Sequence, residues 1–321
     1  MRVIVRSVNL GGREFLFVCG KGGVGRTTVS AALALSAARA GKRVLVAMCN
    51  TKERLSQLLE VEPIGNENQP VGPGFEAVNM TPETALQEYG RMILRVRALY
   101  RAVFGNRFVM AFLRGTPGMD AWSMLGKAYY HASHRDRSGT KRYDLVIVDG
   151  PATGHALDML RVPRVLCQIA PPGLLRSEAE AAWRMLTDPN RSGFVVVSLP
   201  EDMPVRETLE LNGALQGELG LPIAGLVING VYPKLFEGSE REFFIDLPQR
   251  LPADSSLVDL ASAARSRCIR ESVQEQSLAT LHAELPTTSL RLPHIFAPEF
   301  GRAAIETLSA RFDPCWDGVS Q

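Results

Sequence analysis

Short runs of apolar residues, each ending at a turn or loop signal, recur along the whole chain. They are rich in Val, Ile, Leu and Phe and lack clean alternation, which is typical of strands buried on both faces of a parallel sheet. Helical patterns lie between them, so we predict an α/β fold: an open, mostly parallel sheet with helices on both faces. The predicted strands are residues 15–20, 43–48, 75–80, 144–150, 194–200, 224–230 and 288–293.

The stretch from residue 81 to residue 142 interrupts this alternation. Thr81 and Pro82 form a helix start, as the cap and the first turn. Apolar residues then recur at three- and four-residue steps as far as Phe104, which predicts an amphipathic helix about six turns long. Pro117-Gly118 breaks the chain before a second apolar segment. We expect a helical subdomain, residues 81–142, inserted into a single domain that spans residues 1–321, with loops at 62–74 and 135–142.

Composition narrows the class of protein. Of 321 residues, 45% are hydrophobic and 22% are charged, which excludes a mainly disordered or collagen-like chain. The net charge of +2 gives no support for nucleic-acid binding. We find neither an apolar stretch long enough for a membrane span nor a secretion signal. Five scattered cysteines without a Cys-x-x-Cys pair favour a reducing cytoplasm and argue against a zinc clasp.

A glycine-rich loop joins the first predicted strand to the helix predicted at residues 27–40. Glycines let backbone N–H groups turn inward around phosphate oxygens at the positive end of a helix, and Thr27 would ligate Mg²⁺. Arg26 stands where a P-loop usually has Lys; it keeps the charge, but its planar fork is bulkier than an ammonium. The phosphate-binding residues are Gly20, Lys21, Gly22, Gly23, Val24, Gly25, Arg26, Thr27 and Thr28.

Two motifs carry a resemblance to a known superfamily. Lys21 ahead of two glycines resembles the deviant Walker A motif of the ParA, MinD, ArsA and nitrogenase iron-protein superfamily. The strand 144–150 carries Asp149 near its end, in the Walker B pattern, where Asp149 would hold Mg²⁺. The resemblance implies that Lys21 acts across a dimer, on the nucleotide of the partner subunit.

The residues after Asp149 narrow the resemblance to one family. Residues 150–157 read Gly-Pro-Ala-Thr-Gly-His-Ala-Leu and resemble the Asp-Thr-Ala-Pro-Thr-Gly-His-Thr-Leu switch of the ArsA family, which includes the arsenite-pump ATPase and the tail-anchored-protein targeting ATPase. This similarity implies a switch role for Pro151, Gly154 and His155. It also implies that Asn229, at the end of a predicted strand, and Pro293 contact adenine.

One motif departs from the family. The first switch of the family reads Asp-Pro-Ala-His-x-Leu-Ser, and its Asp activates the attacking water. Alignment on Leu55-Ser56 places Asn50 at the Asp position and Glu53 at the His position. An amide orients water but accepts no proton, so we expect hydrolysis to be slowed; Glu53 would substitute if the loop bends differently.

The sequence therefore predicts an ArsA-like ATP-binding protein, an ATPase whose dimer switches with Mg-ATP and controls a helical subdomain that binds a partner or a hydrophobic protein cargo. Lys21, Asn50 and Arg26 form the expected catalytic set, and Thr27 and Asp149 the metal site. Two alternatives stay open: a catalytically impaired pseudoATPase subunit of a heterodimer, favoured by Arg26 and Asn50, and a ParA- or MinD-like positioning ATPase.

Overall fold

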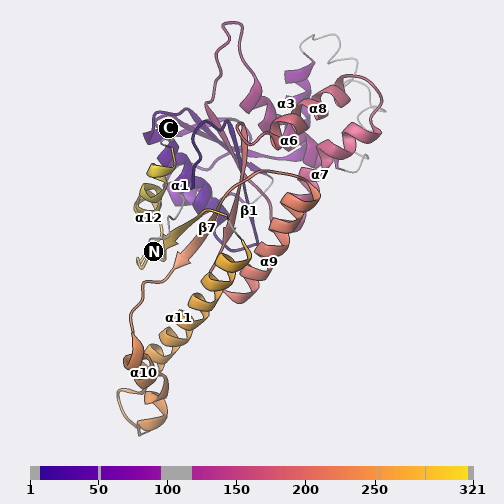
Figure 1. Cartoon of the computed structure of the whole chain (residues 1–321). Helices are drawn as coiled ribbons and strands as arrows, with labels where there is room; N and C mark the ends of the chain where they lie inside the picture. The colour runs from indigo at the N-terminus through magenta and orange to yellow at the C-terminus, as the bar shows by residue number, and fades with distance from the viewer. Residues whose placement is uncertain (1–7, 50–51, 95–117, 253, 286, 317–321) are drawn as a thin grey trace.

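The computed structural model describes residues 8–49, 52–94, 118–252, 254–285 and 287–316 (Figure 1). Eight described strands form one sheet in the order β3-β4-β2-β5-β1-β6-β7-β8, and every neighbouring pair is parallel except β3–β4. All seven predicted strands are confirmed. The strands are β1 Phe15–Gly20, β2 Val44–Cys49, β3 Gln69–Gly72, β4 Phe75–Met80, β5 Leu145–Asp149, β6 Ser192–Ser198, β7 Ile223–Val231 and β8 Ser289–Pro293.

Helices cover both faces of the sheet, which confirms the predicted fold class. Alternate residues of β1 enter different cores: Leu16 and Val18 pack with α1 and α12, whereas Phe15 and Phe17 pack toward α6, α7 and α9. The described helices are α1 Arg26–Arg39, α2 Leu55–Leu59, α3 Pro82–Ile93, α6 Met119–Ser133, α7 Thr153–Ile169, α8 Leu174–Thr187, α9 Asp202–Gly213, α10 Gly238–Arg250, α11 Val258–Glu284 and α12 Arg302–Ser309, with short helices at Ala214–Glu218 and Ala310–Cys315.

Two predictions of local structure are wrong. The expected loop at 62–74 contains β3, which pairs antiparallel with β4 at the edge of the sheet. An edge strand tolerates Pro70, which lacks an N–H for the ladder. The predicted six-turn helix is shorter, because α3 ends at Ile93 and Leu94 leaves the helical region with ψ 71°. The rest of that prediction, from residue 95 to Phe104, lies outside the described residues.

Four helices, α3, α6, α7 and α8, share a small core of their own beside the sheet. At its centre the rings of Tyr89 and Trp122 meet edge to face with centroids 5.8 Å apart. Leu166 of α7 and Ala182 of α8 complete this core. The helix that follows β5, α7, is therefore packed against α6 and α8 and shares a core with α3.

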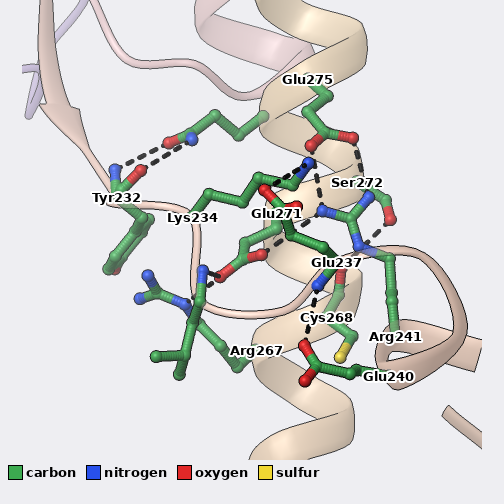
Figure 2. Close-up of polar contacts among 12 residues, drawn as sticks. Tyr232, Lys234, Glu237, Glu240, Arg241, Arg267, Cys268, Glu271, Ser272 and Glu275 are labelled. Atoms are coloured by element: carbon green, nitrogen blue, oxygen red, sulfur yellow. Dashed lines mark hydrogen bonds and ion pairs between the residues drawn. The ribbon is translucent and has the colours of Figure 1, made fainter. Parts of the chain in front are cut away.

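Helices α10 and α11 form an arm that extends away from the sheet (Figure 1). Figure 2 shows how its base is fixed: the buried carboxylate of Glu271 accepts hydrogen bonds from Arg267 and from the backbone N–H of Leu235. Arg241 of α10 donates to both Glu271 and Glu275 of α11. Across the described residues, no helix combines the length and the apolar character needed to cross a membrane.

Candidate functional site

Two glycines of the loop between β1 and α1, Gly20 and Gly25, leave no room for a side chain. A Cβ on Gly20 would lie 2.4 Å from the carbonyl oxygen of Val197. Gly25 has φ 91°, in the left-handed region, and a Cβ there would lie 2.2 Å from Nδ2 of Asn229. The loop is thus held narrow and turned onto the N-terminus of α1, where backbone N–H groups favour an anion.

Thr27, in the first turn of α1, meets Asp149 at the end of β5. Its Oγ1 donates a hydrogen bond of 2.7 Å to Oδ2 of Asp149. Oδ1 of the same carboxylate accepts a hydrogen bond of 3.1 Å from Ser30. Burial raises the pKa of Asp149, while the hydroxyl of Thr27 and the charge of Arg26 oppose that rise. The structure therefore brings together the two residues predicted to hold Mg²⁺.

Arg26 folds back onto its own loop. Its Nη1 donates a 2.7 Å hydrogen bond to the carbonyl oxygen of Gly20, and burial lowers the pKa of its guanidinium. The positive group therefore lies inside the glycine-rich loop, but it is bound to backbone. A phosphate would have to compete with that carbonyl for the guanidinium.

Lys21 points toward α9 of its own chain. Its Nζ lies 2.8 Å from a carboxylate oxygen of Glu207 and 2.9 Å from the sulfur of Met203. The two charged side chains are 28% and 34% exposed, so the pair lies at the surface beside the loop. In this arrangement Lys21 is held in cis.

Asn229 lies near the end of β7, beside the loop, and Pro293 ends the neighbouring strand β8. Asn229 donates a 2.9 Å hydrogen bond from Nδ2 to the carbonyl oxygen of Val24. The ring of His294 stacks on Tyr232 with centroids 4.5 Å apart. The predicted adenine contacts thus lie at the same edge of the sheet as the phosphate loop, and an aromatic pair flanks them.

The segment after Asp149 leads straight into α7. Ala152 is the N-cap of that helix, and Gly154 and His155 are exposed in its first turn. The hydroxyl of Thr153 is buried without a hydrogen-bond partner in the described structure. Pro151 therefore lies between β5 and α7, whereas Gly154 and His155 belong to the first turn of α7, which packs against α6 and α8.

Of the two residues predicted for the first switch, the structure describes only Glu53. Asn50 lies outside the described residues. Glu53 is already occupied: its carboxylate accepts a 2.7 Å hydrogen bond from the backbone N–H of Ser56 and one of 2.5 Å from its hydroxyl. The carboxylate of Glu53 is therefore bound to Ser56 in the first turn of α2, and this contact differs from the role of a substitute base.

Two residues at the site were missed by the sequence reasoning. Ser30 follows Thr27 by three residues, a spacing that places both side chains on one face of α1. That spacing could have indicated it. Glu207 belongs to α9, and nothing in its local sequence pairs it with Lys21, since 186 positions separate the two residues.

The chain is similar to one protein family and to several known ATPases. Residues 13–170 match the family model described as anion-transporting ATPase, ArsA_ATPase. ATPase BagA of Mycobacterium tuberculosis is 27% identical over 302 residues, which cover 90% of this chain and 88% of that protein. An arsenical pump-driving ATPase of Acidiphilium multivorum is 28% identical over 298 residues, which cover 87% of this chain and 46% of that protein. A putative arsenical pump-driving ATPase of Halobacterium salinarum is 30% identical over 238 residues, which cover 69% of this chain and 36% of that protein.

Proposed function

Since the chain belongs to the ArsA family of P-loop ATPases, we propose that it binds ATP with Mg²⁺ and hydrolyses it slowly as a dimer. The observation that carries this proposal is the contact between Thr27 and Asp149, 2.7 Å long and placed at the mouth of a glycine loop. The five cysteines, all of them described and none in a disulfide, support a reducing cytoplasm as the compartment.

The loop residues bind the triphosphate. Backbone N–H groups from Gly22 to Thr28 face the phosphate oxygens, and the N-terminal end of α1 adds positive potential. Arg26 leaves the carbonyl oxygen of Gly20 and donates to phosphate instead. Asn229 and Pro293 contact the adenine from β7 and β8.

The donor set at Thr27 and Asp149 fits Mg²⁺. A hydroxyl and a carboxylate are hard oxygen ligands, and Mg²⁺ in nucleotide sites takes few protein ligands together with phosphate oxygens. When bound, Mg²⁺ neutralises charge that develops on the phosphates. Thr27 and Asp149 hold it, and Asn50 positions the attacking water.

Lys21 supplies charge to the nucleotide of the partner subunit. To do so it must first leave Glu207, with which it pairs in cis at 2.8 Å. Such an exposed pair contributes at most about 1 kcal/mol, so dimer formation can open it at small cost. The partner is a second copy of this chain or a related ATPase.

The nucleotide state is passed on through α7. Residues Pro151 to His155 respond to the phosphates at one end of this helix, and its buried side reaches the core shared with α3 and α6. Val162 of α7 lies so close to Gly118 that a Cβ there would be 3.1 Å from its Cγ2. We place the surface for a partner or hydrophobic cargo on the unit of residues 81–142.

A second function is favoured by one observation, the contact of Arg26 with Gly20. A guanidinium bound to its own loop and an amide at residue 50 would suit a pseudoATPase that binds ATP and regulates a competent partner. Both functions require the same nucleotide site and differ only in turnover.

Calorimetric titration of ATP with and without Mg²⁺ tests the shared site. We expect Mg²⁺ to tighten ATP binding in the wild type and in the control Asp144→Asn, whose side chain pairs with Arg43 at the other end of β5. We expect Asp149→Asn to lose most of the Mg²⁺ effect, because the amide carries no charge for the metal. Absence of ATP binding by the wild type would contradict the proposal.

A further inference from the structure

We propose that Ser30 is a positioning residue that fixes the carboxylate of Asp149 for the metal, an inference that rests on the proposed Mg-ATP site. The phosphate-binding residues predicted from the sequence end at Thr28, before this position. Ser30 is fully buried on α1, at 0% exposure, and its hydroxyl points to β5 rather than to solvent.

Each carboxylate oxygen of Asp149 accepts a hydrogen bond from a different hydroxyl. Oδ2 of Asp149 accepts from Thr27 at 2.7 Å and Oδ1 accepts from Ser30 at 3.1 Å. With both oxygens held by neighbouring turns of one helix, the carboxylate cannot rotate about its own axis without breaking a contact. Asp149 is 2% exposed, so water cannot replace a lost hydrogen bond freely.

The presence of Ser rather than Ala at position 30 supports a role beyond packing. Ala31, Ala32 and Ala34 fill the buried side of α1 around Ser30. Alanine is also the better helix former, by a few tenths of a kcal/mol. A buried helical Ser commonly bonds a carbonyl one turn earlier, but this hydroxyl donates to a side chain 119 residues away.

The contact gains importance once metal binds. The hydroxyl of Thr27 would then bind the metal, and Oδ2 of Asp149 would lose its present hydrogen bond. Ser30 remains as the side chain that orients Asp149 from behind. Residues that hold a metal ligand in this way typically account for about 10- to 100-fold in metal affinity.

The test is a Mg²⁺ titration of a fluorescent ATP analogue bound to the full chain. We expect Ser30→Ala to raise the half-saturating Mg²⁺ concentration about tenfold, while the affinity measured in EDTA stays within twofold of wild type. The matched control is Ser36→Ala. Ser36 is a buried serine of the same helix, but its hydroxyl bonds Asp313 at 2.6 Å, and this variant should keep the wild-type Mg²⁺ curve.

The possible results of this titration distinguish the positioning role of Ser30 from the proposed function. A Ser30→Ala curve that coincides with wild type would overturn the positioning role and leave the nucleotide site intact. Equal shifts in Ser30→Ala and Ser36→Ala would also overturn it, because they would reflect general loosening of α1. A wild type that binds the analogue with no response to Mg²⁺ would instead overturn the proposed function, and this inference with it.

Discussion

Asp149 is buried at the edge of the sheet, but its neighbours favour the charged form of its carboxylate. Burial alone raises its pKa, and Thr27, Arg26 and Ser30 oppose that rise. Sequence spacing was sufficient to predict Thr27 and Asp149, because both belong to motifs with fixed positions around a strand end. It could not predict Glu207, whose pairing with Lys21 depends on how α9 packs after the chain has crossed the sheet.

His131 offers a test of burial at a single residue. Its Nε2 is buried without a partner in the described structure, and burial, helped by the charges of Lys127 and Arg142, lowers its pKa from 6.5 to about 3. The unfolded chain therefore binds a proton more readily than the folded chain between those two values. Stability is full above pH 6.5 and falls as the pH drops toward 3.

We expect His131→Phe to reduce this acid sensitivity. From pH 7.5 to pH 5.5, the free energy of unfolding should fall by about 1 kcal/mol more in the wild type than in the variant. Phe keeps a ring against Tyr143, whose centroid lies 5.6 Å from that of His131. Urea unfolding at the two pH values measures the difference, and parallel losses in both proteins would contradict a buried neutral histidine.

At the scale of elements, local patterns predicted the strands well and the ends of the helical unit poorly. Each central strand is an apolar run flanked by turn residues, so its limits are local. The end of α3 has no such local signal, because the amphipathic pattern continues past Ile93, the last residue of the helix. The edge strand β3 was missed because its pairing with β4, rather than its own Pro- and Gly-containing sequence, creates it.

The contact between α3 and α6 can be tested at Gly126. A Cβ there would lie 2.7 Å from the ring of Tyr89. Gly126→Ala should therefore destabilise the protein by about 2 kcal/mol, although Ala is the better helix former.

Gly213 of α9 is the matched control, since a Cβ there would meet nothing within 4 Å. Gly213→Ala should stabilise by about 0.5 kcal/mol. Denaturant unfolding of both variants measures the two effects. Stabilisation by Gly126→Ala would show that Tyr89 is not packed on this glycine in solution.

At the scale of the whole molecule, the glycine-rich loop, the paired Lys21 and the base of the arm all lie at the carboxyl edge of one sheet. The strand β7 carries Asn229 and continues into Tyr232, whose N–H and C=O are both held by Gln274 of α11. The strand that carries Asn229 is therefore hydrogen-bonded to the arm just beyond its carboxyl end. No sequence pattern indicated this link, because it depends on side chains from segments about 40 positions apart.

The cis pair of Lys21 and Glu207 predicts a change in assembly. Glu207→Gln should free Lys21 and lower the dissociation constant of the Mg-ATP dimer by up to about fivefold, the equivalent of an exposed ion pair. Glu210→Gln, at an exposed position of the same helix, serves as the control. Sedimentation velocity with a non-hydrolysable analogue measures both. A weaker dimer in Glu207→Gln would mean that Glu207 acts across the interface instead.

ATP turnover of the purified chain with Mg²⁺, measured over a range of protein concentrations, tests the proposed dimeric ATPase. We expect slow turnover per subunit that increases with concentration and is abolished in Lys21→Ala, since in the proposed dimer each site would need the lysine of its partner. ATP binding without turnover at every concentration would contradict it. Recovery of turnover in Arg26→Lys combined with Asn50→Asp would then identify the chain as a pseudoATPase subunit.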